Sequence, residues 1–284
     1  MSEAGRVERD FWERRAAAWE RRMDALDLFS DAYGTPAMDA LAAQPGERIV
    51  DIGCGPGTTA IGLAQRVGPD GEVIALDISE AMIAAAQRRA ERAGVTNIRF
   101  LVGDLEREPI EDGGLDGAFS RFGVMFFTDP VAAFSNVARS LRPSGRLACT
   151  VWGPLGDNPW MFVPTLAAAP ALQAELALPG PDEPGPFLLA EPERFISILE
   201  RAGFVDVDVS SVTGARVVTE ADADEEVRAL LEVGPMGEAY DAADEPARQE
   251  AVDAVISAIE PYREEGGWRL AGSAHVVTAA RPAG

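Results

Sequence analysis

Three glycines follow an acidic residue at the end of an apolar run, and this pattern is the clearest sign of chemistry in the chain. The stretch Ile49 to Thr58 reads Ile-Val-Asp-Ile-Gly-Cys-Gly-Pro-Gly-Thr, and Thr59 to Val67 continues with apolar residues at helical spacing. Glycine allows positive φ and close approach of the backbone to a ligand. The N-terminus of the following helix offers free N–H groups. The pattern therefore predicts a strand, a ligand-binding turn and a helix.

The acidic residue before the glycines bears on which ligand the turn binds. A dinucleotide-binding turn has the spacing G-x-G-x-x-G, whereas this chain has Asp51-x-Gly-x-Gly-x-Gly with Thr58 next. Asp51 would repel a pyrophosphate and suits a ligand that carries positive charge near the loop, as the ammonium and sulfonium of S-adenosylmethionine do. An NAD-dependent oxidoreductase is kept as the alternative.

Further polar residues stand where later strands are expected to end. Asp77 follows the glycine loop by about twenty residues, where an acidic side chain can accept the two ribose hydroxyls of a nucleoside. Asp104 follows Gly103 and is expected to accept the amino group of an adenine. Ser120 ends the next expected strand. Because ligands of parallel sheets bind at the carboxyl ends of the strands, these residues predict one site.

The elements that position these residues alternate between strand and helix, which favours a parallel sheet with helices on both faces. In the first half, strands are expected at 48–52, 72–76, 98–102, 115–120 and 146–152, and helices at 58–67, 79–93 and 130–141. Before them we expect an amphipathic helix at 7–26, a turn at 31–37 and a short helix at 37–43. After them we expect helices at 191–202, 222–233 and 246–259 and strands at 204–212 and 268–279.

The composition excludes several kinds of chemistry. The chain has 284 residues, a formal net charge of −22, two cysteines, one histidine and no lysine. So acidic a protein repels nucleic acids and anionic lipids, so we expect neither as a partner. The absence of lysine excludes Schiff-base chemistry, and a single histidine excludes most zinc sites. The N-terminus lacks an apolar signal core and no segment is long and apolar enough to span a membrane, so a cytoplasmic protein with free thiols at Cys54 and Cys149 is expected.

In order and spacing, the glycine loop, Asp77, Gly103-Asp104 and the Pro143–Arg146 turn resemble the class I S-adenosylmethionine-dependent methyltransferases over 48–152. The Ser120–Phe127 run, followed by Asp-Pro, resembles the ubiquinone-biosynthesis-like small-molecule group. The resemblance implies an α/β fold: a Rossmann-like, seven-stranded, mostly parallel sheet whose last strand is reversed, with an N-terminal helix and cap insertions. The expected organisation is a helical lid at 1–44, a cofactor-binding core at 45–153, a cap insertion at 154–190, and the end of the sheet at 191–284 with a helical insertion at about 216–265.

The resemblance also implies the site residues. The residues expected to bind S-adenosylmethionine are Asp51, Gly53, Cys54, Gly55, Gly57, Asp77, Ile78, Met82, Gly103, Asp104, Leu105, Ser120 and Phe122. Aromatic and apolar residues expected to contact the acceptor are Trp12, Trp19, Tyr33, Met125, Trp152 and Trp160. Ser120 replaces the aspartate that binds magnesium in the catechol branch, so no metal is expected.

The predicted function is methylation of a small hydrophobic metabolite at oxygen, nitrogen or carbon by a monomer or homodimer. Because the donor is already activated, proximity and desolvation are the default mechanism. If a general base is used, the candidates are His275, Asp157 and Tyr33. A non-methylating protein that binds the adenosyl ligand, as a cyclase or a scaffold, would carry the same binding residues and stays open.

Overall fold

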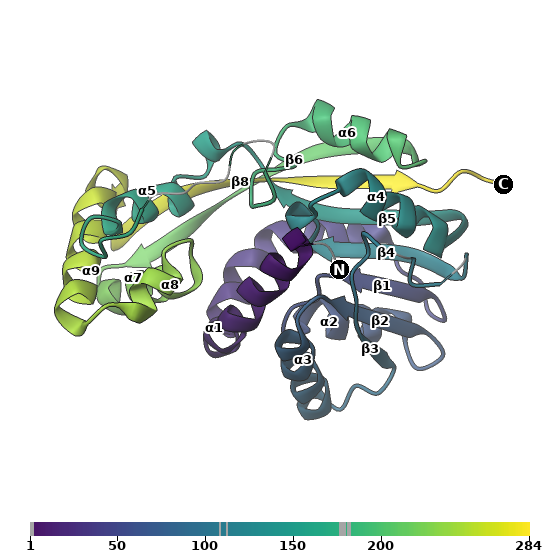
Figure 1. Cartoon of the computed structure of the whole chain (residues 1–284), viewed down its shortest axis with the longest axis horizontal. Helices are drawn as coiled ribbons and strands as arrows, with labels where there is room; N and C mark the ends of the chain where they lie inside the picture. The colour runs from purple at the N-terminus through teal and green to yellow at the C-terminus, as the bar shows by residue number, and fades with distance from the viewer. Residues whose placement is uncertain (1–2, 108, 112, 176–179, 181–182) are drawn as a thin grey trace.

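The strands of the chain form one sheet, in the order β3-β2-β1-β4-β5-β8-β6, with the short β7 paired to β8 (Figure 1). The computed structural model describes residues 3–107, 109–111, 113–175, 180 and 183–284. The strands are β1 (Arg48–Ile52), β2 (Glu72–Asp77), β3 (Ile98–Val102), β4 (Leu115–Arg121), β5 (Leu141–Trp152), β6 (Val205–Thr219), β7 (Arg263–Glu264) and β8 (Gly267–Ala280). β1 to β5 pair in parallel, and β8 pairs antiparallel with both β5 and β6. The mostly parallel sheet with its reversed last strand is thus confirmed.

Successive residues of the central strands face opposite sides of the sheet, so each side has its own core. Val50 of β1 belongs to the cluster on which α4 (Pro130–Ser140) and α6 (Pro192–Arg201) pack, whereas Ile49 belongs to the cluster of α2 (Thr58–Val67) and α3 (Glu80–Ala93). Burial on both faces explains why β1 and β2 read as nearly continuous apolar runs.

The first helix differs from the sequence prediction. Instead of a helix, a turn and a short helix, α1 runs unbroken from Glu3 to Leu41 and includes Pro36. Its C-terminal half packs on β5 and β8 through residues spaced by four, Phe29, Tyr33, Ala37 and Leu41, all of them buried. This apolar face outweighs the loss of the helical hydrogen bond that Pro36 cannot donate.

β6 is also longer than predicted, because it continues with β8 as a long antiparallel ribbon. Gly214 of β6 lies opposite Gly272 of β8, and the Tyr33 hydroxyl occupies the space that a side chain at either glycine would need. Beyond these glycines the ribbon carries a separate core formed with α5 (Pro159–Ala168), α7 (Ala223–Val233), α8 (Gly237–Ala242) and α9 (Glu245–Ile259). We call these four helices the cap, which stands at one end of the molecule in Figure 1.

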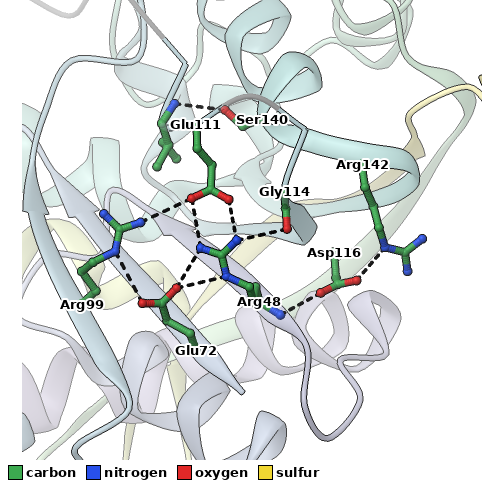
Figure 2. A network of polar contacts seen from close by, with 9 residues as sticks. Arg48, Glu72, Arg99, Glu111, Gly114, Asp116, Ser140 and Arg142 are labelled. Atoms are coloured by element: carbon green, nitrogen blue, oxygen red, sulfur yellow. Dashed lines mark hydrogen bonds and ion pairs between the residues drawn. The ribbon is translucent and has the colours of Figure 1, made fainter. Parts of the chain in front are cut away.

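The amino ends of the parallel strands are joined by a charged network centred on Arg48 (Figure 2). The Arg48 guanidinium donates to Glu72 at 3.0 Å and to Glu111 at 2.7 Å, and Arg99 contacts the same two carboxylates. The Arg48 backbone N–H donates to Asp116 at 2.8 Å. The network therefore fixes the loop before β4 at the amino ends of the parallel strands, on the opposite side of the sheet from the carboxyl ends near Asp77 and Asp104.

In the part of the chain that the structure describes, no helix combines the length and the hydropathy that crossing a bilayer requires.

Candidate active site

One cavity of about 510 Å³ extends from the carboxyl ends of β1, β2 and β4 to the cap. Its wall includes the glycine loop, the segment after β3, the N-terminal half of α1 and the C-terminal end of α7. A sheet of this topology binds its ligands at this edge. The cavity has two parts. One lies at the glycine loop, and the other is lined by aromatic residues and lies next to α1 and the cap.

The three glycines of the loop have different roles. All three have positive φ: 66° at Gly53, 50° at Gly55 and 93° at Gly57. A Cβ at Gly53 would lie 2.8 Å from the Gly123 Cα, and one at Gly57 would lie 2.8 Å from the Ala86 Cβ. At Gly55, which lines the cavity, nothing lies within 4 Å of that position. Gly53 and Gly57 therefore serve packing, whereas Gly55 leaves open space for a ligand.

Asp77, at the end of β2, places its carboxylate in the cavity wall beside this space. Its Oδ2 accepts from the Gly55 N–H at 2.9 Å and its Oδ1 from the Ser79 N–H at 2.9 Å. Burial raises its pKa to about 6, although these backbone donors lower it. Because a carboxylate offers about four lone-pair sites, Asp77 can also accept a hydroxyl group of a ligand.

Asp51 lies behind the loop rather than in the cavity wall. Its Oδ2 accepts from the Thr59 hydroxyl at 2.6 Å, and its buried Oδ1 has no hydrogen-bond partner. Burial raises its pKa to about 7, against the Thr59 hydrogen bond and the charge of Arg121. A buried carboxylate oxygen without a partner fits a ligand that brings positive charge to the loop.

The other expected cofactor residues divide into two groups. Those that line the cavity are Gly53, Cys54, Ile78, Met82, Gly103, Asp104, Leu105 and Phe122. Asp51, Gly57 and Ser120 do not line the cavity: Asp51 lies behind the loop, Gly57 packs on α3, and the buried Ser120 hydroxyl donates to the Ile52 carbonyl. Asp104 lines the cavity, and its Oδ1 accepts the Glu106 N–H at 3.1 Å.

The aromatic part of the cavity gathers rings from segments far apart in the sequence. Phe122 stacks on Trp152 with ring centroids 3.9 Å apart, and Phe29 contacts Trp160 with centroids 4.7 Å apart. Of the expected acceptor residues, Trp12, Trp19, Met125, Trp152 and Trp160 line the cavity. Tyr33 does not, because its ring is fully buried against the β6–β8 ribbon.

The three candidate bases, His275, Asp157 and Tyr33, stand outside the cavity wall. His275 is buried between the Ala190 carbonyl at 2.9 Å and the Ser211 hydroxyl at 3.3 Å, so it joins β8 to its neighbours. Tyr33 is buried with no partner for its hydroxyl, and burial raises its pKa to about 12. Asp157 lies in the short turn Leu155–Asp157, outside the cavity.

Several arginines of the wall were not anticipated. Arg121, at the end of β4, pairs with Asp27 at 2.6 Å and Asp31 at 2.7 Å and so fastens α1 over the sheet. Arg216 of β6 reaches the aromatic part, with its guanidinium carbon 5.7 Å from the Phe29 ring centroid. The predicted strand ended at residue 212. Arg216 was therefore not assigned to a strand whose alternating side chains would place it on the inner face.

The sequence predicted no metal site. Among the described residues, no group of three or more His, Cys, Asp or Glu side chains is placed to hold a metal ion. The two cysteines are buried and unbridged.

The sheet order, the reversed strand and the glycine loop beside Asp77 agree with the fold that the resemblance to the class I methyltransferases implies. Residues 49–145 match the family described as "Methyltransferase domain". Demethylmenaquinone methyltransferase of Beutenbergia cavernae is 35% identical over 147 residues, which cover 51% of this chain and 56% of that protein. Residues 49–145 are thus similar to a methyltransferase domain, and the expected resemblance to the class I methyltransferases of the ubiquinone-biosynthesis-like group is confirmed over this segment. The chain spans about half the length of the demethylmenaquinone methyltransferases that it matches.

Solved structures share the fold at low sequence identity. A protein of Bacillus halodurans, solved as a candidate methyltransferase, has a TM-score of 0.58 and 17% identity, and the match covers 87% of this chain and 98% of that one. The [4+2]-cyclase SpnF has a TM-score of 0.54 and 21% identity, with 89% of this chain and 81% of that one covered. The expected Rossmann-like fold is therefore confirmed.

Proposed function

We propose that this protein is a methyltransferase that uses S-adenosylmethionine to methylate a small, largely apolar metabolite. The observation that carries the proposal is the continuity of the cavity. The open space at Gly55, with the Asp77 carboxylate beside it, leads into the aromatic part formed by Phe29, Trp152 and Trp160. Donor and acceptor would then meet away from bulk water.

The residues present fit the donor. Asp77 would accept its ribose hydroxyls, Met82 and Leu105 would contact its adenine, and Asp104 would accept the adenine amino group. The unpartnered Asp51 Oδ1 would offset the positive charge of its methionine end. When bound, S-adenosylmethionine supplies an electrophilic methyl group on a sulfonium.

The protein's contribution would be positioning and exclusion of water. Trp12 and Trp19 of α1, together with Phe122 and Met125, form apolar wall around the reacting region. Placing two reactants in one closed site can supply several kcal/mol of the barrier. The carboxylates that line the cavity already accept hydrogen bonds, as Glu8 does from the Trp12 indole at 2.7 Å, which favours proximity over general-base catalysis.

A second candidate is a protein that binds the adenosyl ligand without methylating anything. It is favoured by the shared fold of the [4+2]-cyclase SpnF. The two functions differ in one product. Incubation with S-adenosylmethionine and a panel of aromatic acceptors, followed by mass spectrometry for S-adenosylhomocysteine, separates them. Formation of S-adenosylhomocysteine that depends on the acceptor supports the methyltransferase. Saturable binding of S-adenosylmethionine, with conversion of the acceptor but no S-adenosylhomocysteine, supports the cyclase.

A further inference from the structure

Arg216 places a positive charge in the aromatic part of the cavity. It lies in β6 near the cap, and its guanidinium stands over the Phe29 ring, 5.7 Å from the centroid. Its Nε is buried and has no hydrogen-bond partner. A cation over an aromatic face gains some stabilisation, but the ring gives the buried Nε–H of Arg216 no acceptor.

The other arginines of the cavity wall are engaged by protein groups. Arg15 donates to the backbone carbonyls of Glu232 and Gly234, at 2.5 and 3.1 Å. Arg22 pairs with Glu232 and Glu225, and Arg121 pairs with Asp27 and Asp31. For Arg216, the described residues provide a ring face and no acceptor, so it differs from the other three.

The acidic residue that acts on the charge of Arg216, Glu226, already accepts hydrogen bonds from another residue. Glu226, whose charge raises the pKa of Arg216 against the lowering by burial, accepts from the Thr219 hydroxyl at 2.9 Å and the Thr219 N–H at 3.3 Å. Removing a guanidinium from water without a partner is costly, so an anion bound beside Arg216 would offset this cost. The planar fork of arginine matches a carboxylate with two parallel hydrogen bonds.

We propose that Arg216 binds a carboxylate of the methyl acceptor, which is therefore a flat aromatic acid rather than a neutral apolar molecule. The carboxylate would face Arg216, and the ring system would lie against the wall that Phe29, Trp152 and Trp160 form together. That the bound molecule is a methyl acceptor rests on the proposed function. That it carries a carboxylate rests on Arg216 alone.

The test compares two probes of the same shape, 2-naphthoate and 2-naphthamide, by calorimetric titration of the full chain with and without S-adenosylhomocysteine. We expect 2-naphthoate to bind roughly 10- to 100-fold more tightly than the amide, as charge-assisted hydrogen bonds do. Arg216→Met should remove this preference and leave the affinity for the amide within about twofold. Arg216→Lys should restore part of it, because lysine keeps the charge and loses the fork.

Arg269→Met is the matched control, because Arg269 lies on the neighbouring strand β8, exposed and outside the cavity wall, and changes the net charge equally. Equal affinity for the two probes, no binding of 2-naphthoate at millimolar concentration, or an equal loss in Arg269→Met would each overturn the proposal. S-adenosylhomocysteine titrated alone reports on the proposed function separately. If it binds while the probes do not discriminate, only the carboxylate inference fails; if it does not bind while discrimination persists, only the methyltransferase proposal fails.

Discussion

The ring of Phe122 stacks on the indole of Trp152 with centroids 3.9 Å apart and 12° between the ring planes. The backbone of Phe122 has φ of 62°, a conformation that a bulky side chain rarely adopts. Phe122 follows β4 and Trp152 ends β5, so the stack joins the ends of neighbouring strands between the two parts of the cavity. Backbone strain of this kind persists where surrounding contacts enforce it, which is common at functional sites.

The stack should appear as an energetic coupling between these two residues. In a double-mutant cycle of Phe122→Leu and Trp152→Leu, followed by urea unfolding, we expect a coupling of about 0.5–1.5 kcal/mol. Phe11→Leu with Trp152→Leu is the control, because Phe11 contacts Trp12 rather than Trp152 and should act additively. A coupling no larger than that of the control pair would show that the stack does not hold Phe122.

Asp51 should make the ligand-free protein less stable as the pH rises. Its folded pKa of about 7 lies above the usual carboxyl value of 3.8, because burial disfavours the charged form. The folded state therefore holds a proton that the unfolded state has lost, and stability falls between about pH 4 and pH 7. Asp77, with a pKa of about 6, acts in the same direction. Urea unfolding at pH 5.0 to 7.5 should give a smaller decline for Asp51→Asn than for the wild type.

Asp116 offers the opposite case as a control. Burial raises its pKa, but the hydrogen bonds from the Arg48 backbone N–H and the Arg142 guanidinium together lower it by more, so the net shift of the pKa is downward. Its stabilisation is present above the usual carboxyl pKa and is lost only at lower pH. Asp116→Asn should lower stability evenly between pH 5.0 and 7.5. An unchanged pH dependence in Asp51→Asn would contradict the assignment of the shifted pKa to Asp51.

Two helical glycines should respond in opposite ways to alanine. A Cβ at Gly34 of α1 would lie 2.4 Å from the Arg121 Cδ, whose guanidinium is held by Asp27 and Asp31. Gly34→Ala should therefore destabilise the protein by about 1–3 kcal/mol, as overpacking does. At Gly62 of α2 the nearest atom to a Cβ is 3.6 Å away, in the flexible Met38 side chain, so Gly62→Ala should stabilise by up to about 1 kcal/mol. Thermal unfolding of both variants checks the pair, and a stabilising Gly34→Ala would show that Arg121 moves freely.

How much the sequence could predict depends on whether the signal was local. The strand, glycine loop and helix at 48–67 form as expected, because apolar run, turn residues and helical spacing agree there. α1 was wrongly divided, because Gly34 and Pro36 indicate a turn locally, whereas the packing of Tyr33 and Leu41 on β5 and β8 keeps the helix intact. No local pattern reports such a tertiary contact.

The same limit applies to the site. Asp77, Gly55 and Asp104 were found because each stands at a strand end that the sequence reveals. Arg216 was missed because its place depends on the length of β6, which the Gly214–Gly272 pair and Tyr33 determine together. His275 was a candidate base in the expected last strand, and its position between β6 and Ala190 could be known only from the pairing of the strands.

The charged network at Arg48 should affect stability and not ligand binding. Arg48→Met removes the contacts to Glu72 and Glu111 at the sheet edge opposite the cavity (Figure 2). Because these side chains are partly exposed, the loss should be about 1 kcal/mol and should shrink at high salt. Chemical unfolding at 0.05 and 0.5 M salt, together with titration of S-adenosylhomocysteine, measures both effects. A weakened affinity for S-adenosylhomocysteine would mean that the amino ends and the carboxyl ends of the strands are energetically coupled.

The central claim is that the cavity at Gly55 and Asp77 binds the adenosyl donor. Its most direct test is ligand-induced thermal stabilisation with S-adenosylmethionine, S-adenosylhomocysteine and NADH, each variant compared with its own ligand-free midpoint. A ligand at a hundred times its dissociation constant adds roughly 2.7 kcal/mol. The account predicts stabilisation by the two adenosyl ligands alone, abolished in Asp77→Ala and retained in Asp70→Ala, whose side chain is exposed in the turn before β2. Stabilisation by NADH alone would contradict it.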